Sequence, residues 1–223
     1  MFSQLTTSWI LGLGVSGPVM EVPEPSAPDY PDAPLCDSQT LYESIRLPDD
    51  PQLFTIWHPE RAYGTIEMIE ALQLAAQQME WLMPHADPIV VGDLSREGGG
   101  PLSGHRSHRG GLDADIGIYF DDGRQYQQGF LVVEPAAFDL DANWFLIRAL
   151  LDSGLVERIL LDAAFVIRLR SYVTRTGELS HAEAARIFPQ DEDAWLMNGV
   201  VHHVSGHRHH MHIRVHCPTT VAW

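Results

Sequence analysis

Two histidine-containing segments, about a hundred residues apart, have the residue types of a divalent metal site. The first is Gly104–Asp115, with the sequence GHRSHRGGLDAD, and the second is His207–Pro218, with the sequence HRHHMHIRVHCP. A catalytic zinc takes three nitrogen or carboxylate ligands and keeps one position open for water. His108 and Asp115, separated by six residues, and one histidine of a His-x-His pair would supply that set. The pattern predicts a metal-dependent hydrolase.

The second segment is expected to form a strand over residues 210–216. Side chains alternate across a strand, so two sets of residues face opposite ways: His210, His212, Arg214 and His216 on one face, and Met211, Ile213 and Val215 on the other. The apolar face is predicted to pack on the core, which leaves the imidazoles in a cleft. One imidazole can then bind the metal while its neighbour, about 6–7 Å along the strand, transfers protons.

The first segment is expected to lead from a loop into a strand. Asp113 and Asp115 share one face if the strand begins there, and His108 comes from the loop before it. Gly110 and Gly111 allow a sharp turn between the two ligands. A site of two imidazoles and one carboxylate keeps a net positive field, which lowers the pKa of a bound water towards about 7. A nearby histidine can accept the water proton and return it to a leaving amine.

A second interpretation of the histidines is a His-rich tract with loose metal affinity. It would comprise the histidines at 202, 203, 207, 209, 210, 212 and 216. The tract alternates with apolar residues at strand period and ends in Cys-Pro, unlike a metal-buffering tail. The pairing with the upstream segment favours a defined site.

The elements that position these segments indicate an α+β fold. Helices are expected at 65–83, at 143–153 with Asn143 as N-cap, at 162–173, and after a capping box at Ser180–Glu183; strands are expected at 89–91, 116–120 and 156–161. No regular βαβ rhythm appears, so we expect a small antiparallel sheet that bears the site and is flanked by helices. Residues 18–34 are rich in proline and extended. We therefore predict an N-terminal segment and linker or arm over 1–35 and one domain over 36–223.

Composition narrows the choice of partner and compartment. The formal net charge of −16 argues against nucleic acid, and a solvated acidic surface explains it better than attraction of amine substrates. No stretch is apolar enough to span a bilayer. Residues 8–20 make a poor signal peptide because no Lys or Arg precedes them, so either a targeting segment lies upstream or these residues form an ordinary strand. Cys36 and Cys217 are either two unrelated buried thiols or, in an exported protein, one disulfide.

Together the two segments resemble the penicillin-insensitive murein endopeptidases. That family is related to D-Ala-D-Ala peptidases, lysostaphin-type enzymes and the hedgehog signalling domain, which share a His-x6-Asp pair followed by His-x-His. The family pattern Gly-His-x-Ser-His-x-x-Gly-Leu-Asp-x-Asp corresponds to Gly104–Asp115. The pattern His-Arg-x-His-Met-His-[Val/Ile]-Arg-x-x-Cys-Pro corresponds to His207–Pro218.

The resemblance implies a role for each matching residue. The implied zinc ligands are His108, Asp115 and His212, with His105 adding a ligand or steadying the bound water. His210 is implied to be the general base and acid, and His207 a second catalytic or transition-state-binding histidine.

Three further residues complete the candidate site. Asp113 is either the hydrogen-bond partner of a ligating imidazole or a solvent-facing strand acid. Ser107 is expected to orient the loop. Arg96 either binds the substrate, as an arginine does in related D-Ala-D-Ala peptidases, or is a plain surface arginine.

The resemblance also implies a periplasmic or secreted protein that cleaves peptide crosslinks of peptidoglycan, chiefly the D-alanyl–diaminopimelate bond. A second zinc, held in some relatives downstream of the first segment, has no clear histidine counterpart near Asp139, Asp141 and Asn143. Three alternatives remain open: a D-Ala-D-Ala-type carboxypeptidase or dipeptidase, a non-catalytic zinc-stabilised binding module, and a non-haem iron oxygenase. Both His207 and His210 disfavour the binding module, and the six-residue ligand gap disfavours the oxygenase.

Overall fold

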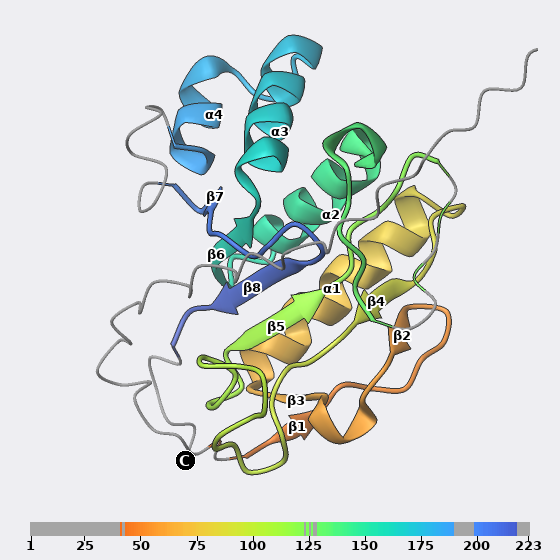
Figure 1. The fold of residues 1–223 in the computed structure, drawn as a ribbon, viewed down its shortest axis with the longest axis vertical. Coiled ribbons are helices and arrows are strands. Elements are labelled where there is room, and N and C mark those ends of the chain that lie inside the picture. Colours follow the sequence, from red (N-terminus) through yellow and green to blue (C-terminus); the bar gives the residue numbers. More distant parts are fainter. Residues whose placement is uncertain are drawn as a thin grey trace, which may run out of the picture.

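The computed structural model describes residues 41, 43–122, 124, 126, 129–189 and 199–217. Its mixture of helices and strands confirms the predicted α+β class. Among these residues a six-stranded sheet has the order β2-β4-β5-β8-β6-β7 (Figure 1). In that order the strands are Phe54–Ile56, Ile89–Val91, Asp113–Ile116, Met211–Val215, Val156–Leu161 and Val201–His203. A separate antiparallel pair joins β1 (Ile45–Arg46) to β3 (Tyr63–Gly64).

Strand direction differs between the centre and the edges of the sheet. The central strands β4, β5, β8 and β6 are antiparallel, as predicted, whereas the outer pairs β2–β4 and β6–β7 are parallel. A parallel pair needs a crossover between its strands. Helix α1 (Ile66–Leu82) provides it between β2 and β4, and α3 (Ala163–Thr176) with α4 (His181–Ile187) provides it between β6 and β7.

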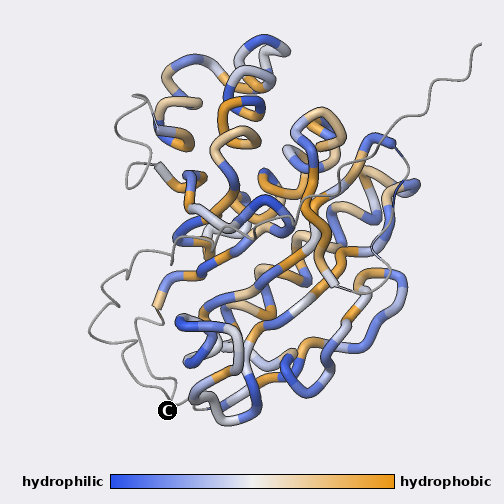
Figure 2. The backbone as a smooth tube through the Cα atoms, in the orientation of Figure 1, coloured by the Kyte–Doolittle hydropathy of each residue, from blue (hydrophilic) through white to orange (hydrophobic). Residues whose placement is uncertain are grey.

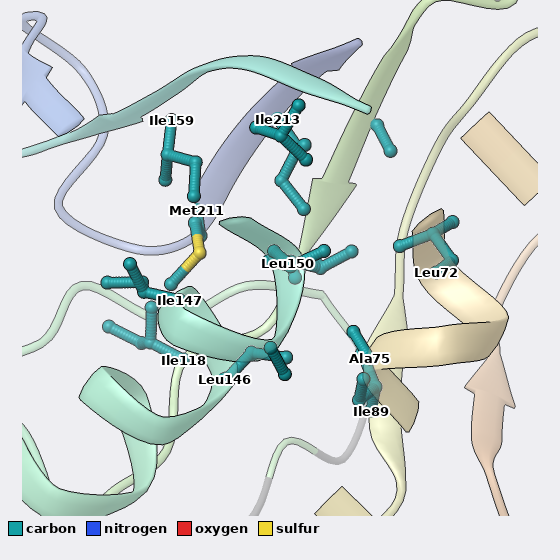
Figure 3. Close-up of a cluster of buried hydrophobic side chains, with 14 of the residues drawn as sticks. Leu72, Ala75, Ile89, Ile118, Leu146, Ile147, Leu150, Ile159, Met211 and Ile213 are labelled. Atoms are coloured by element: carbon teal, nitrogen blue, oxygen red, sulfur yellow. The ribbon is translucent and has the colours of Figure 1, made fainter. Parts of the chain in front are cut away.

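One face of the sheet is covered by helices and holds the hydrophobic core. Figure 3 shows Leu72 and Ala75 of α1 and Leu146, Ile147 and Leu150 of α2 (Leu140–Asp152) gathered with side chains from the strands, among them Ile89, Ile159, Met211 and Ile213. In Figure 2 the chain alternates between hydrophobic and hydrophilic residues along β8, as the predicted two-faced strand requires. The face opposite the helices is therefore left for polar side chains.

The predicted helices are present, and short side chains begin them. The hydroxyl of Thr65 accepts a hydrogen bond from the Met68 amide at the start of α1, and Asp162 caps α3. The predicted capping box is confirmed at Ser180 and Glu183, at the start of α4. Such caps satisfy amides of the first helical turn that have no partner within the helix.

The prediction that Asn143 caps α2 was wrong. The helix begins three residues earlier, where the Asp139 carboxylate accepts from the Ala142 amide at 3.0 Å. Asn143 is fully buried, and its amide pairs with both backbone groups of Tyr119. An asparagine whose side chain is engaged by a neighbouring loop is not available as a cap, and Asp139 supplies the alternative.

The strand expected over 116–120 was also placed wrongly, because β5 ends at Ile116. Beyond Ile116, the amide of Gly117 donates to the Val90 carbonyl, and the absence of a side chain there leaves space for the ring of Tyr126. Phe120 forms an isolated β-bridge with Phe138 and is not part of a strand. Residues 1–35, the predicted N-terminal segment, lie outside the described residues. Among the described helices, none has the length and apolar character needed to cross a membrane.

Candidate metal centre

Strands β5 and β8 place the two segments side by side at the centre of the sheet (Figure 1). They pair in an antiparallel register in which Asp115 lies opposite His212 and Asp113 lies opposite Arg214. The residues that alternate with these four along β5 and β8 are buried in the core. The side chains of Asp113, Asp115, His212 and Arg214 therefore share the face opposite the helices. The predicted alternation of β8 and of the two aspartates is confirmed.

One carboxylate oxygen gathers three imidazoles. Asp115 Oδ1 lies 2.9 Å from Nδ1 of His212, 3.3 Å from Nε2 of His108 and 3.3 Å from Nε2 of His210. His108 comes from the loop before β5, and all four residues are buried. The structure thus brings together the three predicted zinc ligands and the predicted proton-transfer histidine.

His108 is oriented as a metal ligand would be. Its Nδ1 lies 2.7 Å from the carbonyl oxygen of Leu94, to which it donates, so the lone pair is left on Nε2. That Nε2 atom is buried and has no hydrogen-bond partner among the described residues, and Asp115 Oδ1 lies 3.3 Å from it. A buried acceptor of this kind costs free energy unless something binds it. Its position beside Asp115 is suited to a cation.

Among the residues that the structure describes, two groups of three have ligand atoms within 4.8 Å of one another. They are His105, His108 and Asp115 from the first segment, and His207, His210 and His212 from the second. The contacts of Asp115 with His210 and His212 join the two groups into one cluster. Its donors are imidazole nitrogens and a carboxylate, which suit zinc better than calcium or magnesium. The residues therefore fit the predicted ion.

A second carboxylate orients His212 from behind. Nε2 of His212 lies 3.0 Å from Asp113 Oδ1, while Nη1 of Arg214 lies 3.1 Å from both oxygens of Asp113. Ligating histidines commonly pair their other ring nitrogen with a carboxylate in this way. The geometry favours the hydrogen-bonding role for Asp113 over that of a solvent-facing acid, since Asp113 is 1 % exposed.

The charges within the cluster shift several pKa values. Burial opposes ionisation of Asp115, but His108 and His210 outweigh it and hold the pKa of that carboxyl well below its usual range. Burial also opposes charge on His212, yet hydrogen bonds to Asp113 and Asp115 raise its pKa to about 9. For His207, burial and the neighbouring imidazoles lower the pKa to about 3. At neutral pH the imidazole of His212 is thus protonated and carries a positive charge between the two carboxylates.

A further carboxylate, that of Asp93, extends the cluster. The sequence did not indicate it as a site residue. It contacts His58 at 2.8 Å, Arg61 at 3.0 Å and His105 at 2.8 Å, and His105 in turn lies 3.5 Å from Asp115. Burial opposes its ionisation, but these three partners together lower the Asp93 pKa to about 2. The available signal was its position two residues after the strand predicted at 89–91.

The cluster lies in a cavity of about 620 Å³. Both segments line it, and it also contains residues that the sequence did not indicate: Trp57, Phe130, Arg158, Leu160 and Val204. A second hollow, of about 690 Å³ and next to Pro84 and Tyr119, contains none of the predicted site residues.

Of the other predicted residues, some line this cavity and others lie away from it. Ser107 lines the cavity, whereas Arg96 does not: it is exposed, and its guanidinium donates to the Gly99 carbonyl. Cys217 packs partly buried against the core. Cys36 lies outside the described residues, so the Cys36–Cys217 disulfide stays a prediction.

Comparison with known proteins shows which family this chain is similar to. Residues 40–171, more than half of the chain, match the model of a family described as penicillin-insensitive murein endopeptidase. The match contains the first segment and ends before the second. Three curated proteins of that name are similar: one from Haemophilus influenzae is 27 % identical over 176 residues, one from Yersinia enterocolitica 30 % over 143, and one from Pectobacterium atrosepticum 33 % over 144.

These alignments cover only part of each relative. They include 73 %, 58 % and 58 % of this chain, and 54 %, 46 % and 44 % of the respective relatives. The chain thus spans about half the length of the curated relatives it matches.

Proposed function

Because the chain belongs to the penicillin-insensitive murein endopeptidase family, we propose that it is a zinc-dependent peptidase that hydrolyses peptide crosslinks of bacterial peptidoglycan. The bond we propose is D-alanyl–diaminopimelate. The observation that carries the proposal is the convergence of His108, His210 and His212 on one oxygen of Asp115. The names of the three curated relatives support the substrate class.

We assign the zinc ligands to His108 through Nε2, Asp115, and His212 through Nδ1, with His105 beside them. Zinc held there would supply a Lewis acid that activates water and polarises the scissile carbonyl. The carboxylate of Asp113 holds the opposite nitrogen of His212, and Arg214 holds Asp113. This chain of contacts fixes the direction in which the His212 lone pair points.

His210 is the proposed general base and acid. It is buried, and its Nε2 lies 3.3 Å from Asp115 Oδ1. A water molecule beside Asp115 would lie within reach of this nitrogen, which could accept a proton from it. After accepting that proton it can transfer it to the amine that leaves the cleaved bond. His207 lies close by, with 5.0 Å between the two ring centroids. Its Nδ1 donates to the carbonyls of Val204 and Ser205, and its low pKa keeps it neutral, so its Nε2 is an acceptor.

The substrate implies where the protein works. Peptidoglycan lies outside the cytoplasmic membrane, so we propose a periplasmic or secreted location. That compartment would also permit the predicted Cys36–Cys217 disulfide.

Digestion of purified sacculi tests the proposal. The zinc-loaded protein is expected to convert crosslinked muropeptide dimers into monomers cut at the D-alanyl–diaminopimelate bond, as fragment analysis would show. His210→Ala is expected to retain zinc and lose about 100-fold or more of the turnover, since proton transfer is removed while the ligands stay. Dimers that persist with zinc-loaded wild-type protein would refute the endopeptidase assignment. Release of terminal D-alanine alone would indicate the carboxypeptidase instead.

A further inference from the structure

His210 is held differently from the other imidazoles of the cluster. The Nδ1 atoms of His108 and His207 donate to backbone carbonyls, which fixes both rings to the fold. Nδ1 of His210 instead contacts Nδ1 of its neighbour His209, and the two rings stack at 4.5 Å between centroids. Because Nε2 of His210 contacts Asp115, the orientation of the ring depends on that contact and on the residues that hold the His209–His210 pair.

Two residues of the loop after β5 contact that pair. The ring of Phe130 stacks on His210 at 5.0 Å with an interplanar angle of 28°, and lies parallel to His209 at 6.4 Å. The hydroxyl of Tyr126 donates to the carbonyl oxygen of His209 at 2.8 Å. One residue thus packs on the imidazoles, and the other holds the peptide between them.

Trp57 connects the two aromatic residues into a wall. Its ring lies 4.7 Å from Phe130 and 5.7 Å from Tyr126, and those two rings lie 5.5 Å apart with an edge-to-face angle of 82°. Edge-to-face and tilted pairs at these separations are favourable beyond the area they bury. We call Trp57, Tyr126 and Phe130 the aromatic wall. Trp57 and Phe130 line the cavity of the metal centre.

Two glycines make room for the wall. A Cβ atom on Gly92 would lie 2.7 Å from the Phe130 ring, and one on Gly117 would lie 2.7 Å from the Tyr126 ring. Neither glycine has a positive φ, so backbone conformation does not require glycine at these positions. Glycine is required there because a Cβ atom would collide with the rings of Phe130 and Tyr126. Gly92 follows β4 and Gly117 follows β5, so the ends of these two neighbouring strands accommodate the wall.

We propose that Tyr126 and Phe130 are positioning residues that hold the His210 imidazole in the orientation needed for proton transfer. This inference rests on the proposed function of His210. Phe130 restricts rotation of the ring by stacking, and Tyr126 restricts the backbone that carries it. Small displacements of a catalytic group can cost up to about 100-fold in rate, so both contacts contribute to turnover without touching the zinc ligands.

A readout independent of activity tests the orientation. In the NMR spectrum of the zinc-loaded protein, the His210 ring proton resonance, assigned by its absence in His210→Asn, should move when Phe130→Leu removes the ring current of the stacked phenyl. Phe130→Tyr keeps the aromatic ring and should leave the His210 resonance unchanged. An unmoved resonance in Phe130→Leu would overturn the proposal, whether or not the protein cleaves peptidoglycan.

Kinetics on a soluble crosslinked muropeptide then separate positioning from substrate binding. Phe130→Leu should lower kcat about 10-fold, and Tyr126→Phe about 3-fold, with unchanged zinc content and KM. Phe130→Tyr should restore kcat. Tyr119→Phe is the matched control, since it removes a hydroxyl that donates to the Asp87 carbonyl outside the cavity, and kcat should not change. A rise in KM at constant kcat would overturn positioning in favour of substrate contact, whereas an inactive wild type would refute only the proposed function.

Discussion

Two buried carboxylates in the same cavity, Asp93 and Asp115, differ in the partners that neutralise them. Asp93 is contacted by His58, His105 and the guanidinium of Arg61. Asp115 is contacted only by imidazoles among the described residues. An imidazole can give up its proton and offer the lone pair to a metal, whereas a guanidinium cannot.

The difference explains why one carboxylate is suited to a metal and the other to structure. Around Asp93 the charge is already balanced, and an arginine occupies the place where a cation would bind. Around Asp115 the balance depends on protons that a divalent ion can displace. His105 contacts both carboxylates and so links the structural cluster to the proposed metal centre.

The largest expected effect comes from removing each charge in turn. Asp115→Asn should lower zinc affinity more than about 100-fold and abolish turnover, because loss of a ligand should exceed the 10–100-fold cost of losing a ligand's hydrogen-bond partner. Asp93→Asn should change zinc affinity less than about 10-fold. Competition with a chromophoric chelator at constant pH measures both variants.

Circular dichroism serves as the control, since both variants must be folded for the comparison to hold. Equal losses of zinc affinity in the two variants would contradict the division of roles, and would make Asp93 part of the metal centre.

An intermediate effect concerns the protons that zinc displaces. The pKa of His212 is raised to about 9, so this imidazole is protonated at pH 7 and must release its proton before it binds metal. Apparent zinc affinity should therefore fall about tenfold per pH unit as the pH decreases below about 8. Calorimetry in buffers of different ionisation enthalpy counts the released protons.

Asp113→Asn sharpens this test. It removes the hydrogen bond that contributes most to raising the His212 pKa, so fewer protons should be released near pH 8. A release that is independent of pH and of Asp113 would show that His212 is not the titrating ligand.

The part of this site that could be predicted from sequence is the part that local geometry determines. Alternation along β8 placed His212 and Arg214 on the face opposite Met211 and Ile213, and the structure confirms it. The order of the sheet was not accessible in the same way. Asp93 reaches the cluster because β4 pairs with β5, a long-range contact that no spacing within the chain encodes.

The loop residues of the cavity could not be predicted either, because they also reach it through contacts between distant parts of the chain. Trp57 and Phe130 reach the cavity from segments that carry no motif, and only the missing side chains of Gly92 and Gly117 indicate that something packs there. The N-cap of α2 was misassigned because the sequence offers Asp139 and Asn143 one helical turn apart. The choice between them depends on Tyr119, which engages the Asn143 amide from another part of the chain.

The smallest expected effect is on stability, and it separates the two carboxylates once more. The Asp93 pKa of about 2, against 3.8 in an unfolded chain, corresponds to about 2 kcal/mol of folding free energy. Because the pKa is lowered on folding, this contribution is complete above about pH 4 and is lost as the pH falls towards 2. Urea unfolding of metal-free wild type and Asp93→Asn should therefore differ by about 2 kcal/mol at pH 6 and converge at acidic pH. His58→Gln should cost less than about 1 kcal/mol, because the His58 side chain is 46 % exposed and water replaces much of its contact with Asp93. A difference for Asp93→Asn that does not change with pH would mean that packing, not its charge, stabilises the fold.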